Sequence, residues 1–342
     1  MEKTRIISID IAKAICIILV AAGHFMPDYA PNWYVVVSDI LRAFRMPFFL
    51  FISGYLHWAT RKPVGYKDFV WKKFQRLMIP YFFVSAIIII IKLLTGDGLA
   101  LDNPITWSAF YEMFYFPVAG YFLWFVFALF LMFLIIPFFN TRKRLLVLLA
   151  LALVGFFVPL SLPKVFCSAE FQVYLLYFVL GCAFAEWINL RKLLDKTHFL
   201  LLLCVFAVLY ALKVQSGILE LKKLMVFFTA LAGFILVLNL SEQIEEKTTA
   251  VKKILLNVSV CSYTIYLFHT TFEGFFKAIL MKIPFLVNNS GNQFVFLFIA
   301  LIVVSAGIII PIIIHEIIIR YSKLFSYLIG TKFSGNKNTI PV

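Results

Sequence analysis

Long apolar segments recur along the whole chain, and they restrict its fold more than any other feature. About 20 predominantly apolar residues of helix are enough to cross the hydrocarbon core of a bilayer. Of the 342 residues, 63% are hydrophobic and 14% are charged, a composition that soluble domains of this length do not have. The sequence therefore predicts an all-α integral membrane protein.

Ten transmembrane helices are expected, packed as one bundle in residues 1–330 and followed by a disordered cytoplasmic tail, residues 331–342. The predicted helix centres lie near residues 16, 48, 86, 130, 153, 179, 205, 231, 266 and 305. The aromatic loop at about residues 96–120 is expected outside, on or re-entering the membrane surface.

Lysine and arginine are distributed unevenly between the alternating loops. With a cytoplasmic N-terminus, 21 of them fall in cytoplasmic segments and 7 in external ones. The positive-inside rule then places both termini in the cytoplasm. The net charge of +14 is mainly an orientation signal that also suits anionic lipid headgroups. Membrane lipids are expected partners, and nucleic acid is not, because no nucleic-acid-binding pattern is present.

A polar trio interrupts the first apolar segment, residues 6–25. Asp10, Lys13 and His24 share one helix face, since Lys13 and His24 are about three turns apart. Ionisable groups inside a membrane helix are costly and indicate function. Two simpler interpretations stay open: an i, i+3 ion pair with an interfacial histidine, and a signal peptide. The further apolar segments and the buried Asp10–Lys13 pair argue against cleavage.

The loop after the second helix is the most basic part of the chain. Its cations are Arg61, Lys62, Lys67, Lys72, Lys73 and Arg76, interleaved with aromatic residues. The loop either sets the topology or binds an anionic, phosphorylated cytosolic ligand, for which guanidinium groups are well suited. Arg76 is the best candidate, because it lies four residues before Pro80 where the third helix meets the membrane.

Polar residues also occur in two late helices. Ser262, Tyr266 and His269 share a face and either bond neighbouring helices or line a cavity. His315 and Glu316 form another intramembrane pair, in which Glu316 is a possible counter-charge for Lys13. The five cysteines are scattered without metal-ligand spacing, so no metal is expected. The chain has no GxSxG, Walker or HExxH motif.

Five motifs in order resemble the acyltransferase-3 family of multi-pass membrane O-acyltransferases. They are Lys13…His24, residues 46–55 (Met-Pro-Phe-Phe-Leu-Phe-Ile-Ser-Gly-Tyr), residues 76–81 (Arg-Leu-Met-Ile-Pro-Tyr), residues 123–125 (Leu-Trp-Phe) and residues 262–269 (Ser-Tyr-Thr-Ile-Tyr-Leu-Phe-His). The family often has arginine at the position of Lys13. The short chain is most similar to the fucose-4-O-acetylase-like branch, which often has histidine where this chain has Arg45.

The resemblance implies an O-acetyltransferase of the bacterial plasma (inner) membrane. It implies acetyl-CoA as the cytosolic donor and a hydroxyl of a cell-envelope saccharide or lipid-linked glycan precursor as the acceptor. His24 is the expected general base, with Lys13 and Asp10 in the same catalytic stripe. Arg76, Lys72 and Lys73 are expected to bind CoA. The residues expected to bind the acceptor are Arg45, Ser262, Tyr266, His269 and Glu316.

Two alternatives remain. A secondary transporter would also place charges within its membrane helices, although the two halves of this chain show no paired broken helices. An enzyme of the same family could use another donor, such as succinyl-CoA.

Overall fold

A computed structural model describes residues 6–95, 105–158, 160, 162–163, 165–188, 194, 198–247 and 250–334. Within these ranges the regular structure is entirely helical, which confirms the all-α prediction. The α-helices are α1 (Ile7–Ala22), α2 (Asn32–Ala59), α3 (Tyr66–Thr95), α4 (Ala109–Glu112), α5 (Trp124–Ile135), α6 (Arg142–Phe157), α7 (Ser168–Trp187), α9 (Phe199–Gln215), α10 (Leu219–Glu245), α11 (Ala250–Leu280), α12 (Pro284–Asn288), α13 (Gln293–Ile317) and α14 (Lys323–Leu328). Short 3-10 helices are η2 (Tyr121–Leu123), η3 (Ile136–Phe139) and η4 (Ile319–Tyr321).

Each of the ten predicted helix centres falls inside a helix of the structure. Among the described residues, six helical segments are long and apolar enough to cross a membrane: Tyr66–Thr95, Tyr121–Phe139, Ser168–Trp187, Leu219–Glu245, Ala250–Leu280 and Gln293–Tyr321. Helix α9 is apolar but has 17 residues, and α1 and α6 have 16 each. The protein is therefore a multi-pass membrane protein, with six long apolar spans where ten were predicted.

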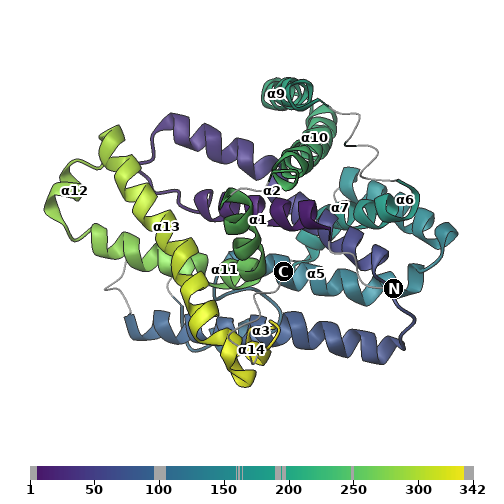
Figure 1. The fold of residues 1–342 in the computed structure, drawn as a ribbon, viewed down its shortest axis with the longest axis horizontal. Helices are drawn as coiled ribbons and strands as arrows, with labels where there is room; N and C mark the ends of the chain where they lie inside the picture. Colours follow the sequence, from purple (N-terminus) through teal and green to yellow (C-terminus); the bar gives the residue numbers. More distant parts are fainter. Residues whose placement is uncertain are drawn as a thin grey trace.

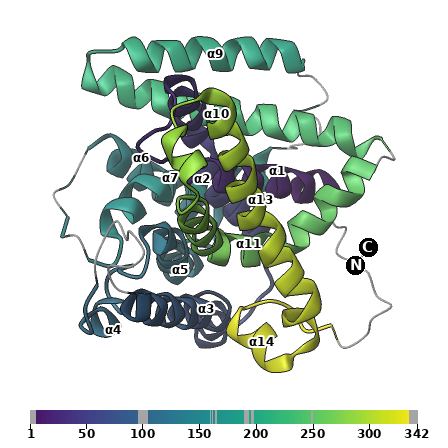
Figure 2. The ribbon, with the colours of Figure 1, turned by 90° about the vertical axis from the view of Figure 1, so that its left-hand side faces the viewer.

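Helix α1 lies in the middle of the molecule and packs against α2, α10, α11 and α13 (Figures 1 and 2). Many of its apolar residues are buried, and Ile11, Ala14 and Ile17 are at most 1% exposed. Both views place α3 and α14 at one edge of the molecule and α9 at the opposite edge. A helix surrounded by protein can hold polar groups away from lipid, so α1 is well placed to carry functional side chains.

Glycines bring α2 and α7 into close contact. A Cβ atom at Gly54 would overlap the carbonyl oxygen of Phe178, and one at Gly181 would overlap that of Phe51. The thiol of Cys182 donates to the Gly54 carbonyl at 3.4 Å. Small residues at crossings of this kind let membrane helices approach backbone to backbone. Gly54, which belongs to the motif at residues 46–55, therefore has a packing role in the structure.

The ends of three helices meet at Glu186. Its carboxylate accepts the indole N–H of Trp58 at 2.6 Å and pairs with Arg61 at 3.2 Å, and Arg142 donates to it as well. These contacts join the end of α2, the end of α7 and the start of α6. They also fix the loop that follows α2.

Two expectations fall partly on residues that the structure does not describe. Residues 96–104 of the external loop and 335–342 of the predicted tail lie outside the described ranges. Residues 331–334 have no regular secondary structure, and the Ser334 N–H donates to the Arg320 carbonyl at 3.0 Å. The described part of the external loop contains α4 and the exposed aromatic residues Trp107 and Tyr111.

Candidate functional site

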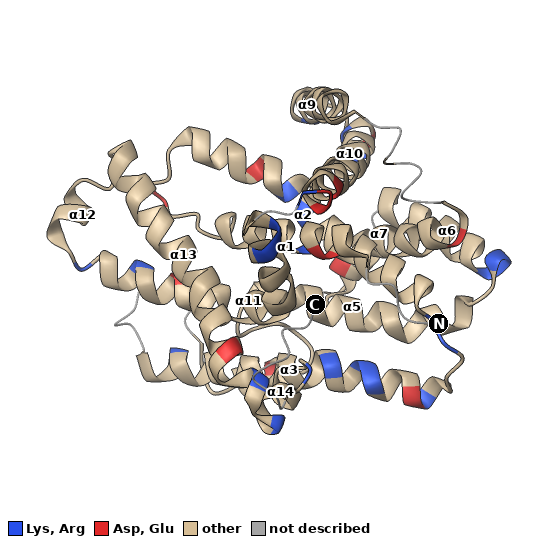
Figure 3. Cartoon of the chain, in the orientation of Figure 1, with Lys and Arg blue, Asp and Glu red and all other residues tan. Residues whose placement is uncertain are grey.

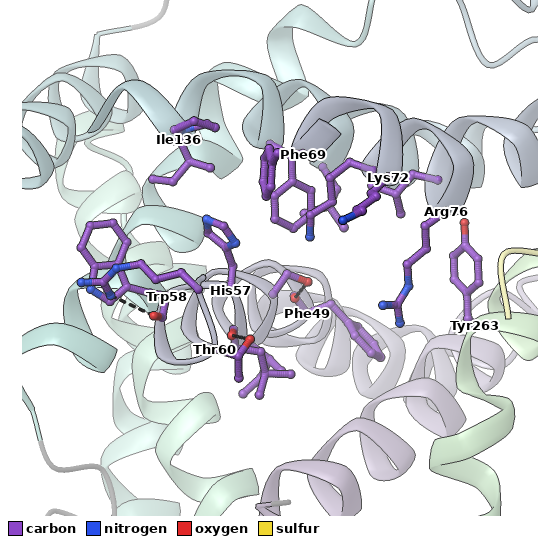
Figure 4. Close-up of a pocket in the computed structure, with 18 of the residues that line it drawn as sticks. Phe49, His57, Trp58, Thr60, Phe69, Lys72, Arg76, Ile136 and Tyr263 are labelled. Atoms are coloured by element: carbon purple, nitrogen blue, oxygen red, sulfur yellow. Dashed lines mark hydrogen bonds between the residues drawn. The ribbon is translucent and has the colours of Figure 1, made fainter. Parts of the chain in front are cut away.

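A large cavity of about 1120 Å³ lies between α1, α2, α3, α5 and α11. It is larger than the roughly 300–1,000 Å³ of most small-molecule sites. The exposed loop after α2, including Lys62 and Val64, forms its mouth. Figure 4 shows His57 of α2 and Lys72 and Arg76 of α3 extending into it.

The lining of this cavity is strongly cationic. Its cations are Lys13, Arg61, Lys62, Lys72, Lys73 and Arg76, and the described lining residues include no aspartate or glutamate. Figure 3 shows Lys and Arg residues grouped along the first part of α3. The ammonium group of Lys73 lies 3.5 Å from the centre of the Phe133 ring. Such a lining favours a large anionic ligand with apolar parts.

Arg76 and Tyr263 extend into the same end of the cavity, Arg76 from α3 and Tyr263 from α11, and Arg76 is exposed (Figure 4). Pro80 has no N–H, so the Arg76 carbonyl lacks the usual helical donor. Gly330 packs on this carbonyl with φ +68°, and a Cβ there would lie 2.5 Å from the oxygen. The segment after α14 thus supports the turn of α3 that carries Arg76.

The inner end of the cavity is closed by aromatic side chains. Phe125 and Tyr266 line it, with ring centres 5.5 Å apart. The Tyr266 hydroxyl donates to the Phe122 carbonyl at 2.6 Å, and the Phe122 ring lies 5.6 Å from that of His269. We call Phe122, Phe125 and Tyr266 the aromatic wall. It separates the cationic cavity from a pair of histidines.

His24 and His269 meet on the other side of the aromatic wall. Their ring centres are 5.0 Å apart, with the rings inclined by 64°. The His24 side chain is exposed, and His269 is fully buried. Nδ1 of His269 bonds the carbonyls of Ile265 and Tyr266 at 3.0 and 2.9 Å. Carbonyls only accept, so Nδ1 carries the proton and Nε2 of the neutral ring has the free lone pair.

Arg45 holds the end of α1 that carries His24. Its guanidinium donates to the carbonyls of Leu19 and Gly23 at 3.0 and 3.3 Å. A Cβ atom at Gly23 would overlap this guanidinium, so the glycine makes room for it. A cation at a helix C-terminus also suits the helix dipole. Arg45, predicted to bind the acceptor, uses its terminal nitrogens for this contact and keeps Nε without a partner.

The remaining predicted site residues occupy different parts of the molecule. Lys13 lines the cavity and pairs with Asp10 at 2.7 Å, so the predicted i, i+3 ion pair forms. Ser262 and Tyr266 line the cavity as well, and Tyr266 is part of the aromatic wall. Glu316 pairs with Arg320 at 2.7 Å.

Cys261, His315 and Glu316 form the one group among the described residues with three potential metal-ligand atoms within 4.8 Å of one another. Nδ1 of His315 bonds the Thr264 hydroxyl at 2.9 Å. The Arg320 guanidinium beside Glu316 opposes a metal ion at the same place, because both are cations.

Sequence reasoning missed Glu273 and Gly23. Glu273 lies four residues after His269, one helical turn further along α11, and is 5% exposed. A carboxylate inside an apolar span was itself a signal, because such residues mark functional sites. Gly23 had no signal of its own, since its role depends on Arg45 arriving from another helix.

These features define a multi-pass membrane protein with a cationic cavity on one side of an aromatic wall and a histidine pair on the other. The acyltransferase-3 family model, described as an acyltransferase domain, matches residues 6–316. The chain therefore belongs to this family of O-acyltransferases, whose general donors are acyl-CoA thioesters. The match confirms the resemblance and the predicted enzyme class. Comparisons with curated proteins and with solved structures gave no significant match.

Proposed function

We propose that this protein is a bacterial inner-membrane O-acetyltransferase that moves an acetyl group from cytosolic acetyl-CoA to a hydroxyl of a cell-envelope saccharide or lipid-linked glycan precursor. The observation that carries the proposal is the cationic cavity, which ends one helical turn short of both histidines, at Val20 on α1 and Tyr266 on α11. A transporter would need no acyl-CoA, whereas family membership assigns transfer chemistry.

The cavity suits the anionic end of acetyl-CoA. Lys72, Lys73 and Arg76 line the cavity from α3, and Arg61 and Lys62 line it from the loop at the mouth, so together they would hold the CoA phosphates. Trp58, Tyr66 and Phe69 offer aromatic faces for the adenine. The apolar inner part would take the pantetheine arm and direct the thioester towards the aromatic wall.

His24 is the general base of the proposed reaction. The net reaction forms an ester bond between the acceptor oxygen and the acetyl carbon, and it breaks the thioester C–S bond. The hydroxyl proton passes to the imidazole of His24, and the leaving CoA thiolate finally takes up a proton. Lys13 lies about 16 Å from His24 along α1, so Lys13, held by Asp10, contacts the donor and not the reacting hydroxyl.

Binding of acetyl-CoA to the purified protein in nanodiscs tests the donor site without knowledge of the acceptor. We expect Arg76→Ala to weaken binding about 10- to 150-fold, through loss of a charge-assisted contact of about 1.5–3 kcal/mol. Arg76→Lys should recover part of the affinity, because an ammonium lacks the planar fork of a guanidinium.

Lys67→Ala is the matched control, because Lys67 is an exposed cation of the same helix that does not line the cavity. It should change the affinity less than threefold. Equal small effects at Arg76 and Lys67 would mean that the basic loop only sets the topology, and the proposed donor site would be wrong.

A further inference from the structure

Several buried polar atoms on the far side of the aromatic wall have no hydrogen-bond partner among the described residues. They are Oε1 of Glu273, Nε2 of His269, Nε of Arg45 and the hydroxyl of Tyr29. Buried polar atoms in folded proteins are nearly always hydrogen-bonded, so a group of orphaned atoms indicates a bound polar partner.

The three charged or titratable members of this group lie close together. His269 and Glu273 are one turn apart on the same face of α11. Arg45 is within electrostatic range of both, and of the exposed His24. Glu273 is 5% exposed and Arg45 is 4% exposed. Of these side chains, His269 contacts the His24 ring, with 5.0 Å between ring centres, and Arg45 bonds the carbonyl of the neighbouring Gly23.

Space for the Glu273 carboxyl comes from a glycine on a neighbouring helix. A Cβ atom at Gly307 of α13 would lie 2.7 Å from Oε1 and from Cγ of Glu273. The next residue of α11, Gly274, is exposed and has no atom within 4 Å of its Cβ position. The missing side chain at Gly307 thus leaves room for the Glu273 carboxyl, whereas a side chain at Gly274 would meet open space.

The chemistry of these atoms selects one class of ligand. Nε2 of His269 accepts a hydrogen bond, Oε1 of the Glu273 carboxyl can accept one, and Nε of Arg45 donates one. A hydroxyl group satisfies both kinds because it donates and accepts. An alkyl chain would leave every one of these atoms unpaired.

We infer that Glu273 and His269 form a hydrogen-bonding subsite for the hydroxyl groups of a polyol or saccharide acceptor, beside His24 and opposite the donor cavity. This inference rests on the proposed acyl transfer to a hydroxyl. Glu273 binds a hydroxyl of the acceptor, and Arg45 both positions His24 and contributes its Nε.

Kinetics of CoA release by the purified full-length protein test the subsite, with acetyl-CoA as donor and methyl fucoside, methyl glucoside and methyl galactoside as acceptor probes. We expect Glu273→Ala to raise the KM for the accepted glycoside about 10- to 100-fold, as for loss of a hydrogen bond to a charged group. The KM for acetyl-CoA should stay within twofold. Glu273→Gln should recover part of the loss, since its amide oxygen still accepts.

A double-mutant cycle separates this role from a purely structural one. Gly307→Ala should raise the glycoside KM by displacing the carboxyl, but should add little in the Glu273→Ala background, where the displaced atoms are absent. Gly274→Ala is the matched control and should leave both KM values unchanged. If Glu273→Ala does not fold, Glu273→Gln and Gly307→Ala provide the same comparison.

The outcomes distinguish this inference from the function on which it rests. If no glycoside stimulates CoA release by the wild-type protein, both the proposed acceptor class and the subsite are wrong. If the wild type transfers to a glycoside but Glu273→Ala and Glu273→Gln leave its KM unchanged, only the subsite is wrong. Equal rises in the KM values for glycoside and acetyl-CoA would likewise overturn the subsite, because they would indicate a general structural effect.

Discussion

At the scale of single residues, the two histidines differ in ways that divide their roles. His24 is exposed and makes no side-chain hydrogen bond within the described part of the chain, whereas His269 is fixed by two main-chain carbonyls. A base that meets an incoming hydroxyl must be accessible, so His24 suits proton abstraction. The fixed and buried ring of His269 suits binding.

We predict that His24→Ala abolishes acyl transfer while expression and membrane insertion persist, because a methyl group cannot accept a proton. CoA release in the presence of an acceptor glycoside measures the effect. His198→Ala, at an exposed histidine preceding α9, should behave as wild type. Activity of His24→Ala within a few-fold of wild type would remove this residue from the mechanism.

Gly23→Ala should slow the proton abstraction assigned to His24, although the His24 side chain itself is unchanged. The new methyl group would displace the Arg45 guanidinium from the end of α1 and shift His24 with it. A misplacement of about 1 Å can cost about 100-fold in rate. We expect a lower kcat with an unchanged affinity for acetyl-CoA, measured by steady-state kinetics and donor binding. A wild-type kcat would show that Arg45 does not position His24.

At the scale of helices, the close crossing of α2 and α7 depends on two glycines, Gly54 and Gly181. Gly181→Ala should destabilise the protein by about 1–3 kcal/mol or more, because overpacking forces the backbones apart. Thermal unfolding in detergent measures this loss. At Gly155 of α6 a Cβ has its nearest atom at 3.5 Å, so Gly155→Ala should be tolerated. Equal melting temperatures for the two variants would contradict the close crossing.

The positions of the helices could be predicted from the sequence, because apolar periodicity and length are local properties. The polar face of α1 could be predicted for the same reason, and the Asp10–Lys13 pair forms as the i, i+3 spacing suggested. The contacts between helices that are distant in the chain could not be predicted in this way. That Ser262 and Tyr266 line the cavity depends on how α11 packs against α1 and α3.

The partner of Glu316, by contrast, is a local one. Spacing alone allowed a contact with Lys13, but its partner in the structure is Arg320, four residues further along. Lys13 has Asp10 as its own neighbour. Local partners are favoured because fewer degrees of freedom must be fixed to bring them together.

At the scale of the whole molecule, the distribution of positive charge predicts the side of the membrane from which the cavity opens. Single cysteines introduced at Lys62 and Gly65 should react with a membrane-impermeant reagent only after the cells are opened, and those at Trp107 and Tyr111 in intact cells. The background needs Cys204→Ala, since Cys204 is exposed and Cys16, Cys167, Cys182 and Cys261 are buried. External labelling at Lys62 would invert the topology and the proposed donor side.

The aromatic wall has a consequence for the cell as well as for the reaction. Any path that carries an acyl group through a membrane protein is also a potential leak for protons and small ions. Phe122, Phe125 and Tyr266 close the path between the cationic cavity and the histidines, with the Tyr266 hydroxyl bonded to the Phe122 carbonyl. If the proposed function and the predicted topology hold, this closure lets the membrane keep its electrical insulation while the acyl group is transferred.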